Sequence, residues 1–152
     1  MGKERATEAD RIRAVRALAR ASSVLERASS ELSLAHYRVL AAISSGSAMA
    51  LRIADRLAVG KPTISAAVEA LERRGLLERL AVAGDQRAAT LRLTPDGERL
   101  LHRVEEEMTA RLDDLCGRVS DPARMLEALV CLGEAIDSRM AERHPDWAGR
   151  NR

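Results

Sequence analysis

The segment from Gly60 to Gly75 carries small and polar side chains that could read nucleic acid. Ile64, Val68 and Leu71 recur at helical spacing, which predicts one apolar stripe against a core. The opposite face carries small or polar residues, namely Pro62, Thr63, Ser65, Ala66, Glu69, Ala70 and Arg73. Such a bare face suits close approach to the floor of a DNA major groove. An ordinary surface helix with an Ala-rich outside is the alternative.

The polar groups on this face suggest specific contacts with DNA. The hydroxyls of Thr63 and Ser65 can bond base edges, and the methyl of Ala66 can meet a thymine methyl. Glu69 can accept a hydrogen bond from cytosine, or it can disfavour wrong DNA by repulsion. Lys61 and Arg52 are candidates for phosphate contacts, with solvated surface charges as the alternative.

The remaining reactive side chains do not form a site. Cys116 and Cys131 show no CxxC spacing, so we expect burial as small apolar residues, with thiol sensing of oxidants as the alternative. The three histidines form no cluster, which argues against a bound metal. No catalytic triad or phosphate-binding Gly loop is present, so we expect neither an enzyme nor a cofactor.

Residues that start and stop helices predict three short helices that end at Gly75. Ser33 and Ser47 are candidate caps for the second and third helices, and Gly60 and Gly75 bound the fourth. Short β-like runs at 76–82 and 89–94 enclose a predicted loop at 83–88, which makes a hairpin. A helix-turn-helix followed by a hairpin is a winged helix, and Arg87 near its tip suits a narrow minor groove.

Longer helices flank this module. An apolar face recurs from Ile12 to Leu32, which predicts one long helix after a cap at Thr7. Thr94-Pro95 and Asp121-Pro122 predict the starts of two further helices, with stripes that reach Val119 and Met140. Neither stripe can be buried alone, so we expect these helices to pack with one another and with a second chain.

The composition agrees with a helical protein whose central segment, residues 50–93, binds an anion. The chain has 152 residues with a net charge of +2, 46% hydrophobic residues and 1% aromatic residues. Residues 50–93 hold eight basic and five acidic residues, whereas residues 95–152 hold nine basic and thirteen acidic ones. The basic middle favours phosphate contact. The charged N-terminal segment and the lack of a long apolar run lead us to expect a cytoplasmic protein without a membrane span.

Three segments in order resemble the MarR (multiple antibiotic resistance regulator) family of bacterial transcription factors. They are Leu71-Glu72-Arg73-Arg74-Gly75-Leu76-Leu77, Asp85-Gln86-Arg87 and Leu91-Arg92-Leu93-Thr94-Pro95-Asp96-Gly97. The resemblance implies an obligate homodimer that places two winged helices on a pseudo-palindromic duplex. It also implies that Thr63, Ser65 and Ala66 lie near bases, that Arg87 enters the minor groove, and that Asp85 pairs with Arg87.

The resulting expectation is a mainly α fold with a minor β part. Residues 1–32 and 95–146 would form the dimerisation domain, 33–94 the winged helix-turn-helix domain with its two-stranded wing, and 147–152 a tail. The expected function is a homodimeric repressor that binds double-stranded DNA and is released by an unidentified small-molecule effector or an oxidant. A dimeric protein-interaction module of the same fold, without specific DNA binding, is the alternative.

Overall fold

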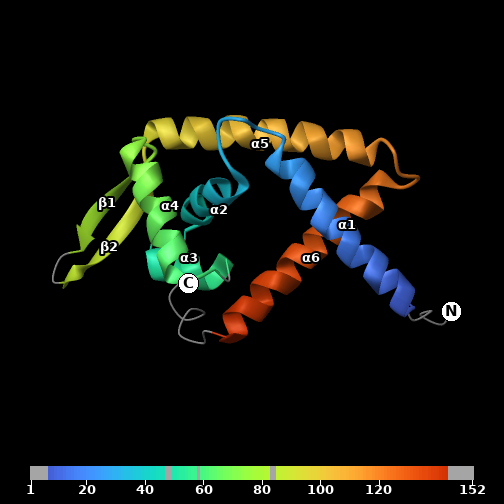
Figure 1. Ribbon diagram of the computed structural model, residues 1–152, viewed down its shortest axis with the longest axis horizontal. Coiled ribbons are helices and arrows are strands. Elements are labelled where there is room, and N and C mark those ends of the chain that lie inside the picture. The colour runs from blue at the N-terminus through green and yellow to red at the C-terminus, as the bar shows by residue number, and fades with distance from the viewer. Residues whose placement is uncertain (1–6, 47–48, 58, 83–84, 144–152) are drawn as a thin grey trace.

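The computed structural model describes residues 7–46, 49–57, 59–82 and 85–143. Its elements are α1 (Glu8–Glu26), α2 (Leu34–Ser44), α3 (Ala50–Leu57), α4 (Lys61–Arg73), β1 (Leu77–Val82), β2 (Asp85–Leu93), α5 (Pro95–Cys116) and α6 (Pro122–Arg143). Helix α5 lies across the molecule, with α2, α3, α4 and the hairpin toward one end and α1 toward the other, and α6 starts at that other end and runs back to contact α3 (Figure 1). Within the described residues, no helix combines the length and apolarity that crossing a membrane requires.

Side-chain caps start the helices where the sequence predicts them. The Thr7, Ser33 and Thr94 hydroxyls accept hydrogen bonds from the backbone N–H groups of Asp10, His36 and Gly97. The carboxylate of Asp121 accepts from the N–H of Arg124 at 3.0 Å, at the start of α6. These bonds satisfy N–H groups that the first turn leaves without a helical partner. The predicted cap at Ser47 lies outside the described residues.

One core joins the helix-turn-helix, the hairpin and the first half of α5. Leu40 of α2, Ile53 of α3, Leu71 of α4 and Val104 of α5 are all fully buried in it. On the hairpin, Leu77 pairs with Leu93 in antiparallel register, and both side chains are buried. The winged-helix arrangement and the mainly α fold are therefore confirmed.

A close backbone contact fixes the start of α5 against the end of α4. A Cβ on Gly97 would lie 1.9 Å from the carbonyl oxygen of Leu76. The same carbonyl accepts from the N–H of Thr94 at 3.2 Å, and the Thr94 hydroxyl donates to the Gly75 carbonyl at 2.6 Å. Gly75 itself has a φ of 69°, a conformation that favours glycine. The end of α4 and the start of α5 are thus locked together.

Three predicted boundaries differ from the structure. Helix α1 ends at Glu26 rather than near Leu32, because the chain turns there to bury Leu32 in the core. Helix α5 ends at Cys116, so Val119 lies in the turn that leads to the Asp121 cap. Strand β2 begins at Asp85, within the segment predicted as a loop. Alternation of apolar residues in the sequence marks only the part of β2 that packs on the core. The first residues of β2 are held by backbone pairing with β1.

The terminal helices leave apolar side chains uncovered. On α1, Val15 is 66% exposed, and on α6, Val130 is 62% exposed. The other large exposed apolar side chains of these two helices are Ile12, Leu18, Leu126, Leu129, Leu132 and Ile136. Helix α1 contacts α5, and α6 contacts both α3 and α5, but these contacts cover only part of each helix.

The Gly97 contact predicts the first testable outcome. Although Ala stabilises a helix interior by about 1 kcal/mol relative to Gly, Gly97→Ala should lower the free energy of unfolding by about 1–3 kcal/mol, because the added methyl overlaps a backbone oxygen. Urea denaturation measures this change. Gly117→Ala, whose Cβ would meet oxygens at an ordinary 3.6 Å, is the control and should be nearly neutral. Equal stability of the two variants would contradict the constraint at Gly97.

Candidate nucleic-acid interface

Helix α4 presents the predicted reading face to solvent. Its buried side is Ile64, Val68 and Leu71, which are 3%, 1% and 0% exposed. The candidate DNA-contacting residues of this helix are all exposed: Lys61, Pro62, Thr63, Ser65, Ala66, Glu69 and Arg73. Because the buried stripe fixes the rotation of the helix about its axis, this outer face has one orientation relative to the core.

The first turn of α4 is open at its N-terminal end. Gly60 is the N-cap, and no side chain caps the helix there. Pro62 lies in the first turn, where its missing N–H costs nothing. Small residues at the start of the helix leave room for a groove wall to approach Thr63 and Ser65.

Ion pairing separates the basic residues of this module into two groups. Arg79 pairs with Glu72 at 3.0 Å, which ties β1 to α4, and Arg92 pairs with Glu78 across the hairpin at 2.6 Å. Among the described residues, no ion pair engages Lys61 or Arg73 on α4 or Arg52 on α3. Within the described residues, no acidic side chain therefore competes with an outside anion for these three side chains.

The wing residues lie in β2 rather than in the predicted loop. The register runs from the pair Leu77–Leu93 to Ala81–Ala89 and then jumps to Val82–Asp85. Gln86 and Arg87 therefore fall in a bulge, a feature that bends and twists a strand. The side chains of Asp85, Gln86 and Arg87 lie outside the described part, so the expected Asp85–Arg87 pair stays a prediction.

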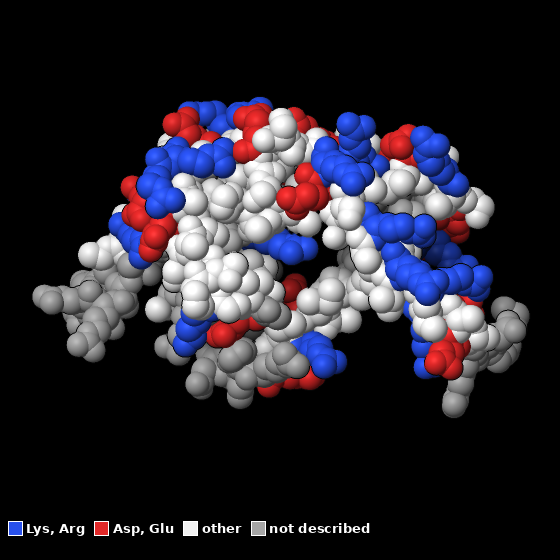
Figure 2. Space-filling model, in the orientation of Figure 1, with Lys and Arg blue, Asp and Glu red and all other residues white. Residues whose placement is uncertain are grey.

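Positive charge is not confined to the winged helix. Figure 2 shows Lys and Arg gathered over α1, whereas basic and acidic residues alternate over α4 and α5. Arg13, Arg16, Arg20 and Arg27 are exposed along α1 and its C-cap. Charge alone therefore does not locate a nucleic-acid surface on this chain, and the shape of α4 is the stronger indication.

The two cysteines differ in environment. Cys116 is buried at the end of α5, as expected for a small apolar residue, whereas Cys131 is exposed on α6, so the expected burial is wrong for Cys131 in a single protomer. Cys116 is the last residue of α5, whose C-terminal end lies far from α4 (Figure 1), and Cys131 lies near the middle of α6. Among the described residues, no group of three His, Cys, Asp or Glu side chains could hold a metal ion.

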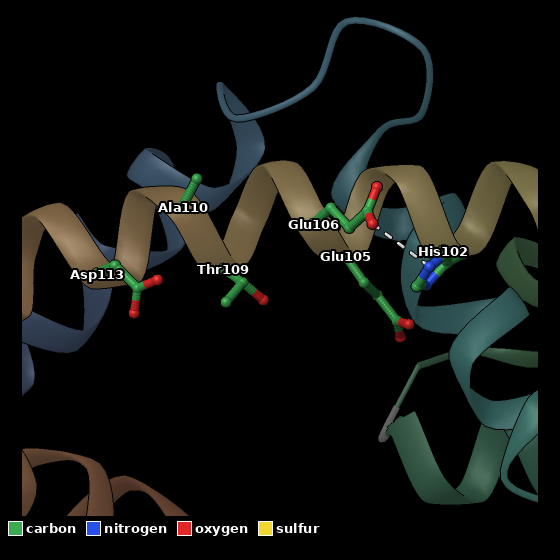
Figure 3. Close-up of a pocket in the computed structure, with 6 residues that line it drawn as sticks. All are labelled: His102, Glu105, Glu106, Thr109, Ala110 and Asp113. Atoms are coloured by element: carbon green, nitrogen blue, oxygen red, sulfur yellow. Dashed lines mark ion pairs between the residues drawn. The ribbon is translucent and has the colours of Figure 1, made fainter.

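A shallow hollow of about 440 Å³ lies along the middle of α5. Glu105, Thr109 and Asp113 project from the same side of the helix there, and His102 lies near Glu106 (Figure 3). The Nε2 of His102 is 3.4 Å from Oε1 of Glu106, which makes an ion pair when the histidine is protonated. The lining of this hollow is open and includes the carboxylates of Glu105, Glu106 and Asp113, which repel an anionic ligand.

Sequence reasoning missed a set of contacts at the C-terminal end of α4. The Arg74 guanidinium donates to the backbone carbonyl of Glu31 at 2.9 Å, and Arg103 of α5 donates to the Glu31 carboxylate at 3.1 Å. Arg74 and Arg103 lie 43 and 72 residues from Glu31 in the chain. No local pattern joins residues so distant, and Glu31 falls inside the segment predicted as one long helix.

Comparison with known proteins agrees with this geometry. The MarR family model matches residues 30–88. The chain is 34% identical over 61 residues to the transcriptional regulator FarR of Neisseria gonorrhoeae, covering 40% of this chain, and 30% identical over 70 residues to the regulator PecS of Dickeya dadantii, covering 46%. The matched segments span 42% of the length of each of these two relatives.

A solved structure extends the similarity over most of the chain. The transcriptional repressor CouR, bound to a 23-mer DNA duplex, matches with a TM-score of 0.71 at 25% identity, covering 86% of this chain and 92% of CouR. Members of the family are regulators of transcription rather than enzymes. The winged helix, the ordered motifs from Leu71 to Gly97 and these matches lead to one conclusion: the chain is similar to the MarR family, whose model matches its residues 30–88.

Proposed function

We propose that this protein is a homodimeric transcriptional repressor that binds a pseudo-palindromic operator through α4 and the wing of each protomer. The exposed, small-residue face of α4, held outward by its buried stripe, is the observation that carries the proposal. The similarity to a repressor bound to a DNA duplex supports it. Its two recognition helices then enter successive major grooves about 34 Å apart.

The residues of the interface take different roles in this proposal. Thr63, Ser65 and Ala66 lie near the N-terminal end of α4, where recognition helices usually meet bases. Lys61, Arg52 and Arg73 contact phosphates, and their lack of ion pairs among the described residues supports this role. Glu69 accepts from a cytosine amino group or excludes other bases.

The wing supplies a second contact. Arg87 enters the minor groove, where narrow A·T-rich segments attract arginine. Asp85 pairs with Arg87 and holds the wing, and Gln86 is the neighbouring DNA contact. The bulge at 86–88 supports this placement, because bulges at sheet edges re-aim side chains.

The second copy of the chain covers the apolar faces of α1 and α6. A single protomer leaves Ile12, Val15, Leu129 and Ile136 exposed on two helices, more than isolated surface residues account for. A two-fold dimer buries the same patch on both subunits. An effector, or an oxidant acting on a thiol, then releases the DNA by changing the separation of the two α4 helices.

The most direct test is selection of bound sequences from a random DNA pool. Wild type should enrich one inverted repeat, and Arg87→Ala should bind that repeat about tenfold more weakly, as expected when a base or groove contact is removed. Arg118→Ala is the control, because Arg118, in the turn after α5, pairs with Asp114 of that helix at 3.0 Å. Failure of wild type to enrich any sequence would favour the protein-interaction module, which the exposed Glu69 on the reading face also fits.

Salt dependence distinguishes phosphate contacts from base contacts. Lys61→Ala should weaken binding to all sequences and reduce the slope of log K against log salt by roughly 0.9, the value for one neutralised phosphate. Thr63→Ala should leave the slope unchanged and relax the preference at one position of the operator. Fluorescence anisotropy at several salt concentrations measures both. An unchanged slope for Lys61→Ala would show that this residue does not bind a phosphate.

Subunit association can be tested at the apolar face of α6. Ile136→Glu should convert a dimer to a monomer, because it places a charge within the covered patch. Ser138→Glu adds the same charge two residues away, on the opposite side of the helix, and should leave the dimer intact. Sedimentation velocity at micromolar concentration reports the mass. A monomeric wild type, or a dimeric Ile136→Glu variant, would contradict the proposed interface.

A further inference from the structure

Glu31 is held at all three of its polar groups. Its N–H donates to the Ser29 hydroxyl at 3.2 Å, and its carbonyl accepts from Arg74 at 2.9 Å. Its carboxylate accepts from Arg103 at 3.1 Å. The neighbouring Leu32 is 2% exposed and anchors the segment in the core. Glu31 therefore bridges the end of α4 and the middle of α5.

This bridge adds a second fixed point to the joint between α4 and α5. The first is the contact of Gly97 with the Leu76 carbonyl. Arg103 lies six residues further along α5, or about 9 Å at 1.5 Å per residue. Packing of α4 and α5 in one core sets their approximate angle, and this second contact restrains that angle further. The bridge thus acts as a strut between the recognition helix and α5.

The charges around Arg74 agree with a role in holding the fold. Burial, together with the positive charge of Arg74, lowers the pKa of His36 on α2. The hydrogen bond and the negative charge of Glu31 raise the pKa of Arg103. By contrast, the adjacent Arg73 makes no ion pair with the described residues. Of two neighbouring arginines, Arg74 holds the fold and Arg73 is available to DNA.

A small change of this angle has a large effect at the DNA. Helix α4 has 13 residues, so its N-terminal end lies about 20 Å from the joint. A rotation of about 10° moves that end by about 3.5 Å, close to the 3.4 Å rise of one base pair. An ion pair too weak to matter for folding can therefore decide which half-site spacing fits.

We propose that Glu31 is a positioning residue that fixes the angle between α4 and α5 and thereby the half-site spacing that the dimer accepts. This inference rests on the proposed function. Glu31 touches no DNA; it acts through Arg74 and Arg103. The carboxylate and the carbonyl have separable roles, because Glu31→Gln removes the charge of the first and leaves the second in place.

The test measures spacing preference. Operators with the selected half-sites are made with one base pair added or removed between them, and binding is measured for each. Glu31→Gln and Arg103→Ala should each reduce the preference for the native spacing by roughly three- to tenfold, with binding at the native spacing changed by less than about threefold. The double variant should match the single ones, since both break the same ion pair. Arg118→Ala should behave as wild type.

Several outcomes would overturn the proposal. If the variants weaken binding equally at every spacing, or only lower the melting temperature, Glu31 has a purely structural role. A wild type that selects no inverted repeat contradicts the proposed function and removes the spacing role with it.

A measurement without DNA then decides whether Glu31 fixes the angle. Spin labels at Ala66→Cys and Arg111→Cys, on exposed positions of α4 and α5, report their separation in a chain whose two native cysteines are changed to Ser. Labelled chain is mixed with excess unlabelled chain, so that only distances within one protomer are measured. Glu31→Gln should broaden the distance distribution, and an unchanged distribution would overturn the strut itself.

Discussion

The close contact between Gly97 and the Leu76 carbonyl is the constraint on which the rest of the structure depends. It brings the end of α4, the start of β1 and the start of α5 to one point. Thr94 reinforces this point by bonding to Gly75 and capping α5. Because the recognition helix, the wing and the long helix diverge from here, their relative directions are set within a few residues. The motif from Leu91 to Gly97 thus forms a structural joint.

From this joint, α4 is directed by burial. Its apolar stripe packs against α2 and α3, and the outer face is left with small and polar groups. Arg79 and Arg92 form ion pairs within the winged helix, with Glu72 and Glu78. Among the described residues, Lys61 and Arg73 form no ion pair and can contact DNA. The adjacent arginines Arg73 and Arg74 differ in the same way, because Arg74 donates a hydrogen bond to the Glu31 carbonyl within the fold.

The sequence was sufficient to predict the winged helix, the outer face of α4 and most helix starts. These features depend on local signals: the spacing of Ile64, Val68 and Leu71, and the caps at Ser33, Thr94 and Asp121. The end of α1 and the start of β2 were predicted wrongly, since Leu32 is buried by a turn and the first residues of β2 pair only through backbone. The bridge at Glu31 could not be predicted, because its partners are distant in sequence and meet only in the folded chain.

The outer face of α4, and not another surface, meets the bases in the proposed complex. The measurement that tests this most directly is photocrosslinking with p-benzoylphenylalanine placed at Ala66 on α4 or at Ala110 on α5, both exposed. We expect crosslinks from position 66 to bases within each half-site of the selected duplex, and none from position 110. Crosslinks from position 110 with none from position 66 would contradict the proposed interface.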